Sequence, residues 1–184
     1  IGAEVRGLLP CLELPTDRAD RDGEISALLA AYGHGGLVRS VPSPRRVSRL
    51  RMIFVEGRGT PNPGAENVQS VDPEVAAVVE AVREHATVFP EQTLAVTALN
   101  AFHAGRLTDA IHRAAQESED LASFIYSDSP EAFQVRAVED VAGLRRDHVI
   151  LAVGFAKTQS NRVLHRFGAL ATPEGLTGMV DTLD

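Results

Sequence analysis

Residues 133–155 read F-Q-V-R-A-V-E-D-V-A-G-L-R-R-D-H-V-I-L-A-V-G-F, and this stretch predicts two strands of one sheet. The first strand covers residues 133–137, a charged turn surrounds Gly143, and the second strand covers residues 148–154. The second run is continuously apolar and rich in β-branched residues, which is typical of a strand covered on both faces. A charged glycine turn beside a parallel strand is where open α/β sheets bind phosphates, although most such turns are simply solvated.

The residues before this stretch alternate between helical and strand patterns. Asp72-Pro73-Glu74 has the pattern of a helix start, with Asp72 as the capping residue, and a valine stripe continues the predicted helix to about residue 86. The other predicted elements are strands at residues 8–14, 50–56 and 93–99 and helices at residues 24–32, 101–115 and 121–126. This order predicts an α/β fold, a three-layer, mainly parallel sheet with helices on both faces. If these strands run parallel, Asn100 and the Gly143 turn are expected at the same edge of the sheet.

Length and charge restrict the class of protein. The chain has 184 residues, which suits a single domain over residues 1–184 with its own core. Residues 57–70, rich in proline, glycine and asparagine, predict a flexible connector within it. A net charge of −7 argues against a generally basic nucleic-acid-binding protein, although a local patch could still bind. The chain starts with Ile1 and stops at Asp184 without a capping signal, so we expect a piece of a longer protein.

Several chemistries and locations find no support in the sequence. One cysteine, Cys11, cannot form an internal disulfide, and the six histidines lack paired metal-ligand spacing, so no metal site is predicted. His103 and His112 are expected to be surface residues of one helix. No G-x-S-x-G hydrolase motif occurs, and we predict no catalytic residue. With no signal peptide or membrane span recognised, the expected location is cytoplasmic.

Several short motifs occur in an order that resembles the second RecA-like domain of superfamily 1 DNA and RNA helicases. The strand end Ala98-Leu99-Asn100, followed by His103, resembles a T-F-N strand end followed by glutamine. Residues 140–147, D-V-A-G-L-R-R-D, resemble N-V-Q-G-x-E-R-D, and the apolar strand after them resembles one that ends in S-V-G-Y. Weaker matches lie at residues 35–44, 55–57 and 167–170, and the resemblance extends from about Pro10 to Gly175.

The resemblance implies two sets of site residues. The nucleotide-facing residues would be Arg18, Asn100, His103, Gly143 and Arg145. The nucleic-acid-binding candidates are Ala98, Arg136, Arg45 and Arg46. The last two lie in the most basic window of the chain, where a proline-containing loop could equally be solvated. ATP and Mg²⁺ would be shared with a first RecA-like domain of the same protein, because the G-x-x-x-x-G-K-[ST] phosphate loop is not in this sequence. Single-stranded nucleic acid is the expected partner, and no membrane is expected.

Two departures from the family pattern leave two functions open. Ala142 and Arg145 stand where the family has glutamine and glutamate. The arginine-rich segment that follows in the family is replaced, after Gly175, by L-T-G-M-V-D-T-L-D, which contains no arginine. The chain is therefore either a second motor domain, inactive alone, or a degenerate helicase-like domain that acts as a protein-interaction or regulatory scaffold.

Overall fold

A computed structural model describes residues 50–62, 65–165 and 167, together with Thr16, Asp17, Ala27, Arg39 and Ser40. The chain divides into two compact units, Ile1–Met52 and Ile53–Asp184. In the first unit, β1 (Thr16–Asp17) pairs in parallel with β2 (Arg39–Ser40). Several predicted features lie outside the described residues: the strand at 8–14, the helix at 24–32 except Ala27, and the site candidates Arg18, Arg45 and Arg46.

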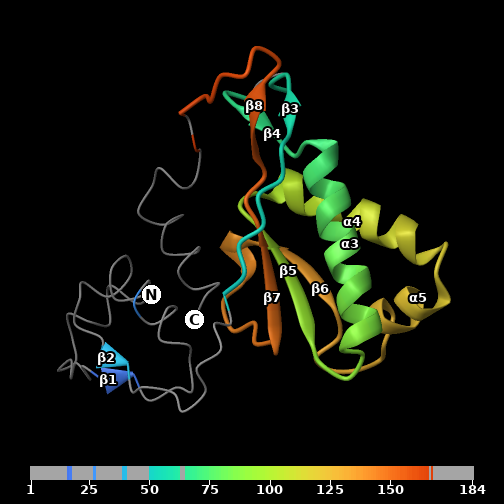
Figure 1. The fold of residues 1–184 in the computed structure, drawn as a ribbon. Helices are drawn as coiled ribbons and strands as arrows, with labels where there is room; N and C mark the ends of the chain where they lie inside the picture. The colour runs from blue at the N-terminus through green and yellow to red at the C-terminus, as the bar shows by residue number, and fades with distance from the viewer. Residues whose placement is uncertain are drawn as a thin grey trace. The chain divides into compact units, whose positions relative to one another are not determined.

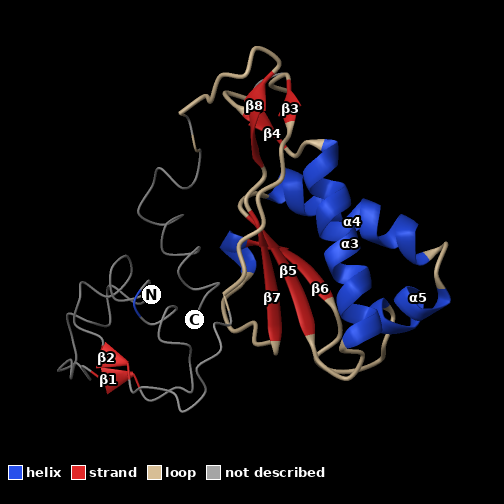
Figure 2. Ribbon diagram, viewed as in Figure 1, coloured by secondary structure: helices blue, strands red, loops and turns tan. Residues whose placement is uncertain are grey.

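The second unit contains a parallel sheet with helices packed on it, as the sequence predicts (Figure 1). The strand order is β6–β5–β7, with β5 (Leu94–Ala98) between β6 (Gln134–Ala137) and β7 (His148–Ala152). The described helices α3 (Asp72–Val88), α4 (Ala101–Ala115) and α5 (Glu119–Ile125) lie together on one side of this sheet (Figure 2). A short 3-10 helix, η1 (Val138–Asp140), follows β6. The α/β prediction with a parallel sheet is confirmed at this level.

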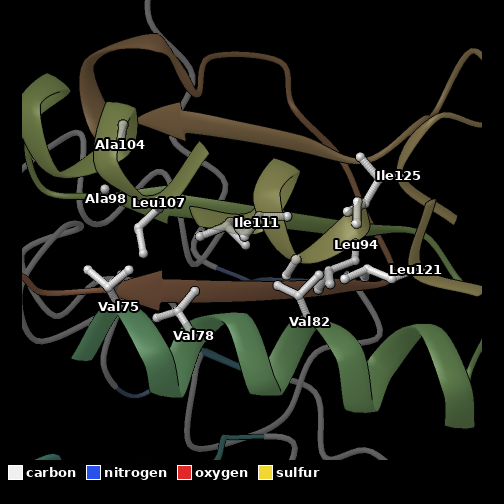
Figure 3. Packing of buried hydrophobic residues seen from close by; sticks show 14 of the residues in the cluster. Val75, Val78, Val82, Leu94, Ala98, Ala104, Leu107, Ile111, Leu121 and Ile125 are labelled. Atoms are coloured by element: carbon white, nitrogen blue, oxygen red, sulfur yellow. The ribbon is translucent and has the colours of Figure 1, made fainter. Parts of the chain in front are cut away.

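The hydrophobic core lies between the helices and the sheet. In Figure 3 the side chains of Val75, Val78 and Val82 on α3 face Leu107 and Ile111 on α4. These valines recur at helical spacing, so the valine stripe in the sequence correctly predicted the buried face. From the sheet, alternate residues of β5 join the same cluster: Leu94, Val96 and Ala98. Alternation places these three side chains on the helical face of the sheet.

The central strand is β5, whereas β7, whose continuous apolar run predicted a strand covered on both faces, is only partly covered. All five residues of β5 are buried, whereas Val149 of β7 is 42% exposed. β7 pairs only with β5 among the described strands, so it forms an edge and only its helical face is packed. An uninterrupted apolar run therefore did not distinguish an edge strand from a central one.

Two other local predictions are wrong. Residues 50–56 form no strand; Met52, Ile53 and Phe54 are exposed, and within the described chain no strand pairs with them. An apolar alternation needs a neighbouring strand before it becomes part of a sheet. Asp72 is not the capping residue of α3, because Val71 occupies that position and Asp72 is the first helical residue.

A second, smaller sheet is built by the segment predicted as a connector. Its strand order is β3–β8–β4, with β3 (Arg58–Gly59), β4 (Val68–Gln69) and β8 (Phe155–Thr158). β3 runs parallel to β8 and β4 runs antiparallel to it. The two ends of segment 57–70 are thus strands, which at two residues each are too short to give a periodic pattern. No helix in the described part of the chain is long and apolar enough to cross a membrane.

Candidate functional site

A cluster of polar side chains lies at the carboxyl edge of the parallel sheet. Asn100 follows β5, and Gly154 follows β7 after a single intervening residue. Because the two strands are parallel neighbours, their ends meet at one edge, where α4 also begins. The sequence predicted Asn100 and the Gly143 turn at this edge; the structure places Asn100 there beside Gly154, whereas Gly143 lies in the turn between η1 and β7. This is the edge at which open α/β sheets bind ligands.

His103 is the centre of the cluster. Its side chain is fully buried, and its backbone N–H donates to Oδ1 of Asn100 at 2.8 Å, so Asn100 caps α4. Its ring Nδ1 lies 2.7 Å from Oγ of Ser70, whose exposed fraction is 1%. The other ring nitrogen, Nε2, is buried without a hydrogen-bond partner. A polar atom left in that state costs free energy unless something else supplies a partner.

The carboxyl group of Glu74 approaches that nitrogen. Its Oε1 lies 3.8 Å from Nε2 of His103 and accepts a hydrogen bond from the N–H of Gly154 at 2.8 Å. Burial raises the pKa of the Glu74 carboxyl, and the Gly154 bond partly offsets this. Burial, together with the positive charge of Arg106, lowers the pKa of His103 to about 4. His103 is consequently neutral at pH 7, and its approach to Glu74 is not an ion pair.

Two backbone positions with positive φ hold the cluster together. Ser70 has φ 54°, and its N–H donates to the carbonyl of Gly154 at 2.7 Å. Gly154 has φ 81°, and a Cβ there would lie 2.9 Å from Cδ2 of His103. Arg106 donates from Nη1 to the carbonyl of Ser70 and from Nη2 to Oδ1 of Asp72 at 2.6 Å. These contacts join the loop before α3, the start of α4 and the link between β7 and β8.

A serine, a histidine and a carboxylate also form the catalytic triad of hydrolases. The geometry of Ser70, His103 and Glu74 does not fit such a triad. The hydroxyl of Ser70 is enclosed, so a substrate has no route to it in this conformation. The separation of 3.8 Å between His103 Nε2 and Glu74 Oε1 is longer than a hydrogen bond. The cluster therefore acts as a buried polar connection between three loops.

The structure separates the other predicted site residues. Ala98, predicted to contact nucleic acid, is completely buried in the core, so its methyl group is not exposed to a ligand in this conformation. Gly143 and Arg145 lie exposed in the turn between η1 and β7, and Gly143 has φ 78°. Arg136 is exposed on β6, where its Nε donates to Oε1 of Gln134 at 3.2 Å.

His103 itself is the clearest correction. It was expected on the surface and facing a nucleotide, yet its ring is enclosed; His112, nine residues on, is exposed as expected. Asn100 uses its side-chain oxygen to cap α4. The ring of His103 is enclosed and the side-chain oxygen of Asn100 is occupied by the helix cap, so neither of these groups reaches a nucleotide in this conformation.

Sequence reasoning missed four members of the cluster: Ser70, Glu74, Arg106 and Gly154. Only Gly154 had a signal, since it ends the second strand of the opening stretch. The positive φ of Ser70 and the long-range pairing of Arg106 with Asp72 leave no local pattern.

Comparisons with known proteins complete the description of the site. Across the described ranges of the chain, no group of three or more histidine, cysteine, aspartate or glutamate side chains could hold a metal ion. The search found no matching family model, no similar curated protein and no similar solved structure.

Proposed function

We propose that the chain is the second motor domain of a superfamily 1 helicase-like protein, which binds and translocates on nucleic acid with ATP and a first domain outside these residues. The proposal includes the RecA-like, three-layer form of the α/β fold. Alone, this domain is not expected to hydrolyse ATP, because it contains no phosphate-binding loop.

One observation carries the proposal. Two matched positions, Asn100 after β5 and Gly154 after β7, lie at the carboxyl edge of the sheet, and the third matched segment, residues 140–147, leads from η1 after β6 to the start of β7. A domain that faces a partner across a cleft needs its ligand-facing residues on such an edge.

A second candidate function is favoured by the enclosed His103. This residue stands at the position of the family's glutamine, but its ring is buried between Ser70, Glu74 and Gly154. Ala142 and Arg145 stand at the two other positions where the family has ligand-facing side chains, a glutamine and a glutamate. The chain therefore keeps the order of the motifs without these side chains. Such a domain would serve as a protein-interaction or regulatory scaffold without turnover.

ATP hydrolysis by the longer protein, with and without single-stranded DNA, tests the two candidates. A motor domain predicts hydrolysis that single strands stimulate, together with strand binding whose affinity falls steeply with salt. A scaffold predicts no hydrolysis that single strands stimulate. If the domain is a motor, Arg145→Glu is expected to increase nucleotide affinity, since it restores the family's acid at an exposed position. Arg113→Glu, on the exposed side of α4, is the matched control. Equal affinities in the two variants would count against a surviving nucleotide pocket.

A further inference from the structure

The small β3–β8–β4 sheet has two chemically different faces. Its packed face carries Gly59, Val68 and Ala156, and a Cβ added to Gly59 would lie 2.9 Å from Cγ1 of Val68. Just before β3, a Cβ on Gly57 would overlap Cγ2 of Val71. These glycines therefore allow β3 to lie close to Val68 of β4 and to Val71, the residue before α3. That face of the small sheet is closed to ligands.

The opposite face carries two cations side by side. Arg58 of β3 is in register with Lys157 of β8, the only lysine in the chain, and paired residues of neighbouring strands point to the same face. Both side chains are exposed. Like charges directly opposite each other destabilise a sheet, so this arrangement costs stability unless an anion lies between them.

No carboxylate lies within ion-pair distance of either cation in the described chain. Neither Arg58 nor Lys157 takes part in an ion pair there. Glu56 is close in sequence to Arg58 and exposed, but the structure forms no ion pair between them. Arg58 and Lys157 therefore form a small positively charged site on a chain whose net charge is −7.

Aromatic rings lie beside these cations on the same face. Phe155 precedes Lys157 by two residues in β8, so alternation puts both side chains on one side. The ring of Phe167 packs edge-on against Phe155 with centroids 5.5 Å apart, and His165 lies 6.1 Å from Phe167. Phe167 is 39% exposed, so part of its ring is available for contact.

We infer that this cationic-aromatic face, made by Arg58, Lys157, Phe155 and Phe167, binds single-stranded nucleic acid. Two neighbouring exposed cations can contact the phosphate backbone of a single strand, and partly exposed rings offer stacking to unpaired bases. A duplex hides its bases and would use only the cations. The face is separate from the residues that the helicase resemblance assigns to nucleic acid, so it is an additional contact surface. The inference shares its ligand class with the proposed function but does not depend on ATP.

The test measures binding of a fluorescein-labelled oligodeoxythymidylate to the 184-residue chain by anisotropy, from about 50 to 200 mM salt. Replacing both cations, Arg58→Gln with Lys157→Gln, is expected to reduce the slope of log affinity against log salt by about 1.4, since each phosphate contact contributes about 0.7. Phe167→Leu removes a stacking ring without changing charge; we expect it to weaken binding by about fivefold or more at an unchanged slope.

The matched control removes two arginines elsewhere, Arg83→Gln with Arg113→Gln, on α3 and α4. It changes net charge by the same amount, so it measures the non-specific effect of charge, and circular dichroism verifies that all variants are folded. Equal slopes in the two double variants, or no binding by the unaltered chain, would overturn the inference. If the face binds while the longer protein lacks stimulated ATP hydrolysis, the proposed motor function fails and the inference stands.

Discussion

Replacing Gly154 by alanine tests how tightly the buried cluster is built. The new methyl group would enter at φ 81°, a conformation that costs an L-residue about 1–2 kcal/mol. It would also lie 2.9 Å from Cδ2 and 3.2 Å from Cγ of His103. That ring has little freedom to move away, because Ser70 holds Nδ1 and Asn100 holds the backbone N–H of the same residue.

The contact with the ring adds a packing cost to the backbone cost. Forcing a methyl group into a filled interior costs about 1–3 kcal/mol, so Gly154→Ala should lower the free energy of unfolding by about 2–5 kcal/mol in total. Gly143→Ala separates the two contributions. Its φ is 78°, nearly that of Gly154, but a Cβ there meets nothing within 4 Å. We therefore expect it to cost only the backbone share, about 1–2 kcal/mol.

Urea unfolding of the purified chain, followed by far-ultraviolet circular dichroism, measures both losses. A third variant, His103→Ala, and its combination with Gly154→Ala complete a double-mutant cycle. If the ring is what the methyl group meets, the two substitutions should couple favourably by about 1–3 kcal/mol. Equal losses for the two glycine variants, with no coupling to His103, would refute the contact.

Three further changes test other contacts. The pKa of His103 is about 4 in the folded chain, below its usual 6.5. The stability that the neutral ring contributes is therefore complete above pH 6.5, and it decreases by up to about 3 kcal/mol as the pH falls towards 4. His103→Gln should remove this pH dependence from the free energy of unfolding. Glu74 acts in the opposite sense, because burial raises its pKa; Glu74→Gln should remove a loss of stability that develops as pH rises above 4.5. The carboxylate of Asp147 accepts hydrogen bonds from the N–H and Oγ1 of Thr93, at 2.8 and 2.9 Å. Asp147→Ala should therefore lower the free energy of unfolding in urea by about 1 kcal/mol. The control, Asp128→Ala, should lower it much less.

Much of the fold could be predicted because local patterns reported the packing. The valine stripe of α3, the apolar strand β5 and the glycine-flanked β7 each identified an element within a few residues. The parallel pairing followed from the alternation of strands and helices. Strands of two residues, such as β3 and β4, carry no periodicity, so the second sheet was not predictable.

The candidate site was only partly predictable for a related reason. The sequence placed Asn100 correctly between a strand and a helix, but it assigned the side chain to a nucleotide and not to the cap of α4 that the structure shows. The enclosure of His103 depends on Ser70 and Gly154, which are thirty-three and fifty-one positions away in sequence. Only the chain's three-dimensional path brings them together, so the histidine looked like a surface residue of an amphipathic helix.

The link between β7 and β8 has a mechanical consequence. The larger sheet passes into the smaller one through two residues, and the second of them, Gly154, is anchored on both its N–H and its carbonyl. A tilt of the smaller sheet must therefore drag Glu74 and Ser70 with it, and with them the first turns of α3 and α4. Because β4 also continues through Ser70 and Val71 directly into α3, the smaller sheet is tied to the helical layer both along the chain and through the two hydrogen bonds of Gly154.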